Sequence, residues 1–252
     1  MNTLSPRPVI VAKPSSASHC IECDARHRSV CNAIGERDLE RLAAVANPRR
    51  LERGQVFIEE GRPAIDFFNI TSGTVKLYKM LPDGRQQITG FAGSGHFLGL
   101  AVSETYAFTA EAIEPIELCR FSRPKLRTLL DDFPALEKRL LETACNELVA
   151  AQEQMLLLGR KTARERVASF LATRYSESST CGPLSGRISL PMTRAEIADY
   201  LGLTIETVSR TLTRFKSEGK IALPSRDEVE LLDPHWLLDV AAGQDSRAAS
   251  FV

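Results

Sequence analysis

Two short helices separated by a glycine are the strongest constraint that this sequence places on its fold. Thr193 is followed three residues later by Glu196, which is the pattern of a capping box at a helix start. Gly202 can then turn the chain sharply, and Thr204 can cap a second helix. Apolar residues recur at spacings of three and four, with Ile197, Ala198 and Leu201 in the first helix and Ile205, Val208 and Leu212 in the second. The segment therefore predicts a helix-turn-helix, a motif that places its second helix in the major groove of DNA.

The outer face of the predicted second helix carries side chains that can contact DNA. Arginine donates two hydrogen bonds to guanine, a carboxylate accepts one from cytosine, and a hydroxyl binds a base or a phosphate. The whole chain is neutral, with 32 basic and 32 acidic residues, but residues 160–226 hold twelve Lys and Arg against six Asp and Glu. The predicted DNA-binding residues are Glu206, Ser209, Arg210, Thr207, Thr193 and Arg214. The alternative is an ordinary solvated face in a helical hairpin.

A long helix is predicted to begin at Pro134, a residue that suits the first turn of a helix. It would extend over about 26 residues and 39 Å, which is too long for one small domain to cover. Pairing with the same helix of a second chain would bury its apolar stripe. The predicted dimerisation residues are Leu140, Ala144, Leu148, Ala151, Met155 and Leu158. The alternative is that the helix lies against its own β-domain.

The segment before this helix has the pattern of a β-roll or sandwich. Short β-like runs between glycine turns occupy about 48–122, including 56–58, 67–70, 74–78 and 87–91. Past the helix-turn-helix, 221–223 and 229–232 predict a two-stranded wing. The expected fold is α+β, with an arm (1–33), a β-roll (34–132), a dimerisation helix (133–160), a winged helix-turn-helix (161–240) and a tail (241–252).

Several classes of protein are not supported by the sequence. It has no run of eighteen apolar residues and no secretory signal, so we expect a cytoplasmic protein without a membrane partner. It has no Gly-rich phosphate loop, zinc-protease His pair or nucleophile elbow, so we expect no enzymatic activity.

Three of the six cysteines lie close together near the N-terminus, at Cys20, Cys23 and Cys31. In a cytoplasmic protein such a cluster favours a metal centre over a disulfide. His19 and His27 flank the cysteines, so structural zinc is one alternative, and thiols without a ligand role are another. Cys145 and Cys181 receive no role.

The order of these elements resembles the CRP/FNR superfamily of bacterial transcription regulators. The likeness spans about 19–238 and is most specific in 192–210, which is similar to the FNR branch, and in 83–91 of the β-roll. The resemblance implies a homodimer that binds the inverted repeat TTGAT-N4-ATCAA through Glu206, Ser209 and Arg210. It also implies a contact between RNA polymerase and the turn 82–85, where Arg85 replaces an acidic residue.

The same resemblance implies a 4Fe-4S cluster held by Cys20, Cys23, Cys31 and Cys119. In this family the cluster is assembled without oxygen and degraded by it, and its loss weakens the dimer and releases DNA. The seven residues between Cys23 and Cys31 resemble a variant spacing of alphaproteobacterial members.

The stretches 95–99 and 106–110 lack the Arg that holds a cyclic phosphate in related β-rolls, so we expect no cyclic nucleotide. A cluster-free CRP/FNR regulator and an iron-sulfur electron carrier remain as alternative functions.

Overall fold

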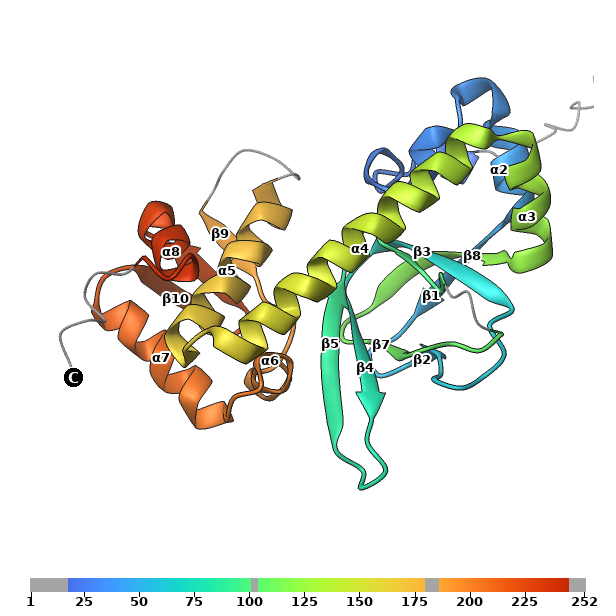
Figure 1. Cartoon of the computed structure of the whole chain (residues 1–252). Coiled ribbons are helices and arrows are strands. Elements are labelled where there is room, and N and C mark those ends of the chain that lie inside the picture. Colours follow the sequence, from blue (N-terminus) through green and yellow to red (C-terminus); the bar gives the residue numbers. More distant parts are fainter. Residues whose placement is uncertain (1–17, 101–103, 180–185, 245–252) are drawn as a thin grey trace, which may run out of the picture.

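The computed structural model describes residues 18–100, 104–179 and 186–244 of the chain. It contains an N-terminal β-roll, a long helix that leaves the roll, and a C-terminal winged helix-turn-helix (Figure 1). The predicted α+β fold is confirmed. The expected flexible N-terminus, Cys181 and most of the expected tail lie outside the described residues.

The β-roll consists of two four-stranded antiparallel sheets, ordered β1-β8-β3-β6 and β2-β7-β4-β5. The strands are β1 (Ala46–Leu51), β2 (Val56–Ile58), β3 (Asp66–Ser72), β4 (Val75–Met80), β5 (Gln86–Ala92), β6 (Phe97–Leu98), β7 (Thr109–Ala112) and β8 (Ile116–Ser122). The four predicted β-like runs coincide with β2, β3, β4 and β5, apart from Thr74, which precedes β4.

The two faces of the β1-β8-β3-β6 sheet are both buried, but against different neighbours. Successive residues of a strand point to opposite faces. Phe68 and Leu118 therefore enter the interior of the roll, whereas Phe67 and Cys119 belong to a second apolar cluster on the outer face. That outer face is covered by residues 18–34, which we call the cysteine arm. The arm contains α1 (Ser18–Ile21), η1 (Arg26–Arg28) and η2 (Val30–Ala33), and it is followed by η3 (Glu36–Asp38) and α2 (Leu39–Val45).

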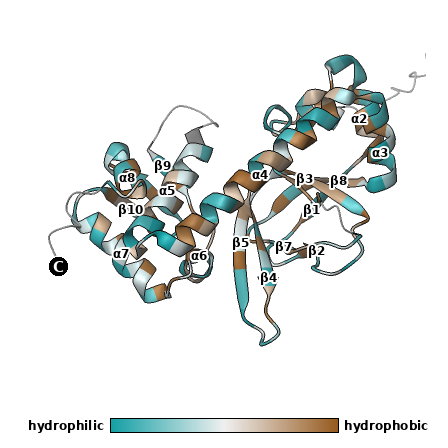
Figure 2. Cartoon of the chain, in the orientation of Figure 1, coloured by the Kyte–Doolittle hydropathy of each residue, from teal (hydrophilic) through white to brown (hydrophobic). Residues whose placement is uncertain are grey.

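After β8 the chain forms α3 (Arg123–Asp132) and then the 27-residue helix α4 (Pro134–Arg160). Leu136 and Leu140, near the start of α4, are buried in the same cluster as the cysteine arm. Leu157, near its end, is buried in the core of the C-terminal domain. The helix is exposed between these ends, and Figure 2 shows apolar residues along that exposed part.

The C-terminal domain has the predicted helix-turn-helix and wing. Its elements are α5 (Ala163–Ser179), β9 (Arg187–Ser189), α6 (Arg194–Leu201), α7 (Ile205–Ser217), β10 (Ile221–Ser225), β11 (Glu228–Leu231) and α8 (Pro234–Ala241). The wing strands β10 and β11 are joined by β9 into a three-stranded sheet. The sequence patterns did not indicate β9 or α8.

This domain packs on the β-roll through α6. The Gln87 side chain of β5 donates a hydrogen bond of 2.6 Å to the carbonyl oxygen of Asp199. Lys76 of β4 forms ion pairs with Glu111 at 3.1 Å and with Glu196, the capping residue of α6, at 3.3 Å. These contacts from β4 and β5 to α6 fix the position of the helix-turn-helix relative to the roll.

Gly202, between α6 and α7, has a left-handed backbone with φ of 60°. A Cβ at this position would lie 3.3 Å from Leu158 Cδ2 and 3.4 Å from Arg166 Nη1. Gly202→Ala should therefore lower the free energy of unfolding, measured by urea denaturation, by about 1–2 kcal/mol.

Gly159→Ala is the matched control because a Cβ there meets nothing within 4 Å and lies in helix α4. It should leave the free energy of unfolding unchanged or raise it by up to about 1 kcal/mol. Equal effects of the two substitutions would contradict the strained turn.

Candidate cysteine site and DNA-contacting surface

The four cysteines named from the resemblance line one cavity between the cysteine arm and the sheet. Cys20 comes from α1, Cys23 from the turn that follows, Cys31 from η2 and Cys119 from β8. The cavity is small, about 20 Å³, and its other lining residues include Arg26 and Asn69. Residues almost ninety positions apart in the chain are thus brought together in the fold.

Local structure explains why two of these thiols point inward. Cys119 lies on the outer face of β8, directly opposite Pro48 of β1 and Asn69 of β3. Cys31 lies in η2, whose start is capped by Ser29: the Ser29 hydroxyl accepts a hydrogen bond of 3.2 Å from the Cys31 amide. Both thiols are buried.

Burial keeps these thiols protonated. It raises the pKa of Cys31 to about 11 and the pKa of Cys119 to about 12, and it also raises the pKa of Cys20. The neutral thiols therefore pack as small apolar side chains. Binding a metal would require them to lose their protons, because the thiolate is the ligand.

Two buried polar atoms at this cavity lack a hydrogen-bond partner in the described part of the chain. They are Nε of Arg26 and Oδ1 of Asn69. Unpaired buried polar groups are rare in folded proteins, and Nε of Arg26, which is a donor, would be satisfied by a group that accepts hydrogen bonds beside the thiols. The sequence analysis missed both residues. Asn69 carries a weak signal, as a polar residue within the apolar run 67–70.

Four thiols form a soft donor set, which suits both zinc and iron-sulfur clusters. Within the described ranges no group of three or more His, Cys, Asp or Glu side chains is arranged to hold one metal ion. A tetrahedral zinc site holds all its sulfur ligands about 2.3 Å from one centre. A 4Fe-4S cluster is a larger group, and its four thiolate ligands lie further apart.

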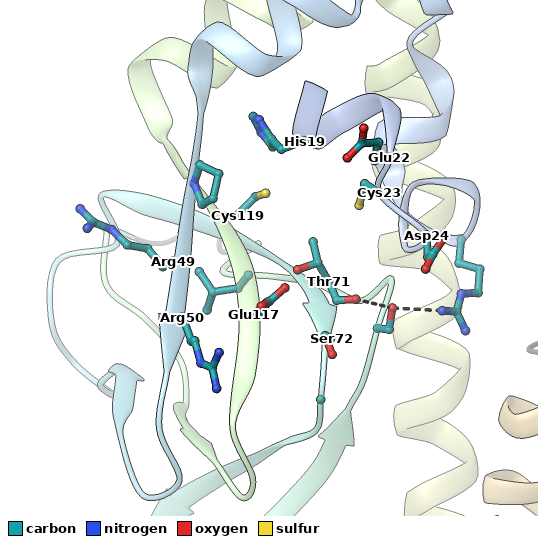
Figure 3. Close-up of a pocket in the computed structure, with 15 residues that line it drawn as sticks. His19, Glu22, Cys23, Asp24, Arg49, Arg50, Thr71, Ser72, Glu117 and Cys119 are labelled. Carbon is teal, nitrogen blue, oxygen red and sulfur yellow. Dashed lines mark hydrogen bonds between the residues drawn. The ribbon is translucent and has the colours of Figure 1, made fainter. Parts of the chain in front are cut away.

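The small cavity adjoins a larger cleft of about 800 Å³. Cys23, Cys119 and His19 line both spaces. In Figure 3 the sulfur atoms of Cys23 and Cys119 both point into the space between the arm and the sheet. The cleft therefore provides a route from solvent to the thiols and room for a group larger than the small cavity holds.

The helix-turn-helix has the predicted local structure. The hydroxyl of Thr193 accepts a hydrogen bond from the Glu196 amide at 3.2 Å, and the Glu196 carboxylate accepts one from the Thr193 amide at 2.8 Å, which confirms the capping box. The Thr204 hydroxyl caps α7 by accepting from the Thr207 amide at 3.2 Å.

The outer face of α7 presents the predicted DNA-binding side chains. Glu206 and Arg210 are exposed, and Ser209 and Thr207 are half-buried. Hydrogen bonds at the start of α7, first from the backbone and then from Thr204, lower the pKa of Glu206, so its carboxylate is charged at neutral pH. An acceptor and a cationic donor thus lie one turn apart on the same face.

Two other predicted DNA-binding residues are already engaged within the chain. Thr193 makes the capping box, and Arg214 forms an ion pair of 2.9 Å with Glu218, which is also paired with Arg164 at 2.7 Å. Ile205, expected in the core, is 47% exposed. Ile205 is the first residue of α7, and the buried residues of this helix begin one turn later, at Val208.

The predicted dimerisation stripe is partly covered at its two ends within the single chain. Leu140 is buried beside the cysteine arm, and Leu158 is half-buried against the C-terminal core. Leu141, which was not predicted, is 66% exposed instead. The exposed stripe runs at heptad spacing through Leu141, Ala144, Leu148, Ala151 and Met155.

The end of α4 is tied directly to the helix-turn-helix. Gln154 donates a hydrogen bond of 3.0 Å to the carbonyl oxygen of Tyr200 in α6. Arg166 donates to the carbonyl oxygens of Leu158 at 2.8 Å and of Leu201 at 2.9 Å. The helix that carries the exposed stripe therefore also supports the turn before α7.

Comparison with known proteins gives two domain families and many relatives. The model of the Crp-like helix-turn-helix domain matches residues 165–240, and that of the cyclic nucleotide-binding domain matches residues 48–133. The nitrogen fixation regulation protein FixK of Bradyrhizobium diazoefficiens is 37% identical over 94% of this chain and 99% of its own length. The transcriptional activator protein FnrL of Cereibacter sphaeroides is 37% identical over 92% of this chain and 95% of its own length.

A solved structure gives the same result. FixK2 of Bradyrhizobium japonicum superposes with a TM-score of 0.72 and 34% identity, over 78% of this chain and 97% of that protein. Sequence, domain order and fold agree, and the chain belongs to the CRP/FNR family of transcription regulators.

Proposed function

We propose that this protein is an oxygen-responsive transcription regulator that binds a 4Fe-4S cluster through Cys20, Cys23, Cys31 and Cys119. The observation that carries the proposal is the convergence of these four cysteines in one cavity, next to the start of α4. When bound, such a cluster supplies a redox-active group whose stability depends on oxygen. The names of the relatives FixK and FnrL do not mention a cluster. The proposal therefore rests on the geometry of the cysteine site in this chain.

The packing around the cysteines gives a physical route from the site to the dimer. Cys31 lies in η2, which packs directly on α4, and Leu136 and Leu140 belong to the same apolar cluster as three of the cysteines. Ligation by all four thiols would fix the arm to β8. The arm would then hold the first turns of α4, and the exposed stripe that begins at Leu141 would be presented in one orientation.

The proposed DNA target is an inverted repeat similar to TTGAT-N4-ATCAA, read by Glu206, Ser209 and Arg210 of each protomer. Two copies of α7 related by a two-fold axis match a palindromic site. Thr207 and Arg214 are expected to support binding at the phosphate backbone, and Thr193 to orient α6 through its cap. The dimer forms through the exposed stripe of α4.

Further partners follow from the same family. RNA polymerase is proposed to contact the β4–β5 turn, which projects from the roll (Figure 1) and carries an ion pair between Asp83 and Arg85. The roll is proposed not to bind a cyclic nucleotide, since its interior holds apolar residues and Tyr106, whose hydroxyl bonds the Asp66 backbone. None of the helices in the described part is long and apolar enough to span a bilayer.

The cluster is tested by anaerobic purification with iron and sulfide analysis. Wild-type protein should hold about four irons per chain and bind the palindromic duplex, and air should abolish binding. Cys119→Ser should lose the iron and the anaerobic binding, because it removes the ligand that joins the arm to the sheet.

Cys145→Ser is the matched control, because Cys145 is exposed on α4 and lines neither space at the cysteine site. It should keep iron content and DNA binding. A metal-free wild-type protein that binds DNA equally in air would instead favour the cluster-free regulator. Reversible redox cycling without DNA affinity would favour the electron carrier.

Direct readout is tested with Arg210→Ala, measured by duplex binding at fixed salt. Loss of the bidentate contact should cost about 1–3 kcal/mol on the specific site and relax its base preference. Lys216→Ala is the control, because Lys216 is exposed on a different face of α7. It should weaken binding to specific and random duplexes alike. An equal loss on both duplexes for Arg210→Ala would rule out its role in reading bases.

The dimer interface is tested with Leu148→Glu, which places a charge in the middle of the exposed stripe. Sedimentation of the cluster-loaded protein should show a shift from dimer to monomer, because an unpaired charge cannot be buried between two helices. Ala150→Glu lies on the opposite side of α4, is also exposed in the chain, and should remain a dimer. A dimer in both variants would place the interface elsewhere.

A further inference from the structure

Two polar side chains at the wall of the cysteine cavity are held in place with an unused polar atom. Arg26 donates a hydrogen bond of 2.9 Å from Nη2 to the carbonyl oxygen of Ile34, so its guanidinium is anchored, and its buried Nε has no partner. Asn69 is only 1% exposed, and its Oδ1 also has no partner. A buried donor or acceptor is normally paired, so two such atoms on the wall of one cavity are positioned to contact a bound group there.

The two residues reach the cavity from opposite elements. Arg26 belongs to η1 in the cysteine arm, between Cys23 and Cys31 in sequence. Asn69 belongs to β3 and lies directly opposite Cys119 in the sheet. The cysteine arm and the β1-β8-β3-β6 sheet, which supply the four cysteines, therefore each contribute one polar side chain to the same cavity.

The chemistry of both side chains suits sulfur acceptors. The guanidinium N–H groups only donate hydrogen bonds, and the amide of Asn69 presents an NH₂ donor when its oxygen and nitrogen are exchanged. A four-iron cluster with four thiolates has a net negative charge in a buried site, and a guanidinium compensates such a charge. Arg26 also lies within electrostatic range of Cys20.

We propose that Arg26 and Asn69 donate hydrogen bonds to the sulfur atoms of the cluster and set how easily it is oxidised. This inference rests on the proposed function, since it concerns the same centre. Hydrogen bonds to cluster sulfur and nearby positive charge stabilise the reduced state, which raises the reduction potential. Removing either donor should make the centre easier to oxidise and shorten its lifetime in air.

The experiment compares wild type with Arg26→Gln, Arg26→Lys and Asn69→Leu, all loaded anaerobically. The readouts are iron content, the reduction potential, and the rate at which the visible absorbance decays in air. Arg26→Gln and Asn69→Leu should each have a more negative potential and a decay at least several-fold faster. Arg26→Lys keeps the charge and should fall between Arg26→Gln and wild type.

Arg28→Gln is the matched control. Arg28 lies two residues further along the same helix, lines the outer cleft and not the small cavity, and donates a hydrogen bond of 3.0 Å to Ser94. It should keep the wild-type potential and decay rate. Thermal unfolding of the metal-free variants separates a folding defect, which would lower the melting temperature, from the electronic effect, which appears only in the potential.

The outcomes separate the two proposals. If wild type binds no iron, the proposed function and this inference both fail. If wild type binds four irons but the potentials and decay rates of Asn69→Leu and the loaded Arg26 variants equal those of wild type, the inference is overturned and the cluster stands. An equal shift in Arg28→Gln would also overturn it, because a general loss of positive charge would then explain the result.

Discussion

The rest of the structure depends on α4, a single helix whose two ends are buried in different cores. Leu136 and Leu140 anchor its start beside the cysteine arm, and Leu157 anchors its end in the C-terminal domain. Between them the stripe through Leu148 has no cover in its own chain. A helix held at both ends couples the packing at one end to the packing at the other, so the β-roll with its arm and the helix-turn-helix domain share one rigid element.

The cysteine site lies beside the start of this helix and is built from segments that are distant in sequence. The arm supplies three thiols and the sheet supplies Cys119, so a ligand to all four closes a loop of almost ninety residues. Closing so long a loop costs chain entropy, and the packing of the arm on the sheet already offsets that cost in the folded chain. A ligand that binds only the folded arrangement stabilises it in return. If the arm is coupled to α4 as proposed, a shift of about 1.4 kcal/mol would change the dimerisation equilibrium constant tenfold.

The sequence predicted the local features of the fold well and the contacts between elements poorly. Capping residues, a left-handed glycine and apolar spacing act within a few residues, so Thr193, Gly202 and Thr204 could be placed correctly. Cys119 could be assigned only through the family resemblance, because nothing local distinguishes it from an ordinary buried thiol. Leu140 and Leu141 show the limit most clearly: both fit an apolar helix pattern, and only the tertiary fold shows that the arm covers one and leaves the other exposed. Arg26 has no sequence signal and Asn69 only the weak one of a polar residue in an apolar run, since the unpaired buried atoms of both residues are visible only in the fold.

The contacts between α6 and the β-roll explain how a change in α4 would reach the DNA-contacting face. The helix-turn-helix is held from two sides, by Gln154 of α4 and Arg166 of α5, and by Gln87 and Lys76 of the roll. Gln87 of the roll bonds the backbone of α6, and Lys76 bonds its capping residue Glu196. These two contacts fix where α7 begins relative to the sheet. The contacts with α4 and α5 fix the same turn relative to the exposed stripe. If two chains pair through that stripe as proposed, the spacing of the two α7 helices would depend on the angle between the two α4 helices, whose first turns pack beside the cysteine arm.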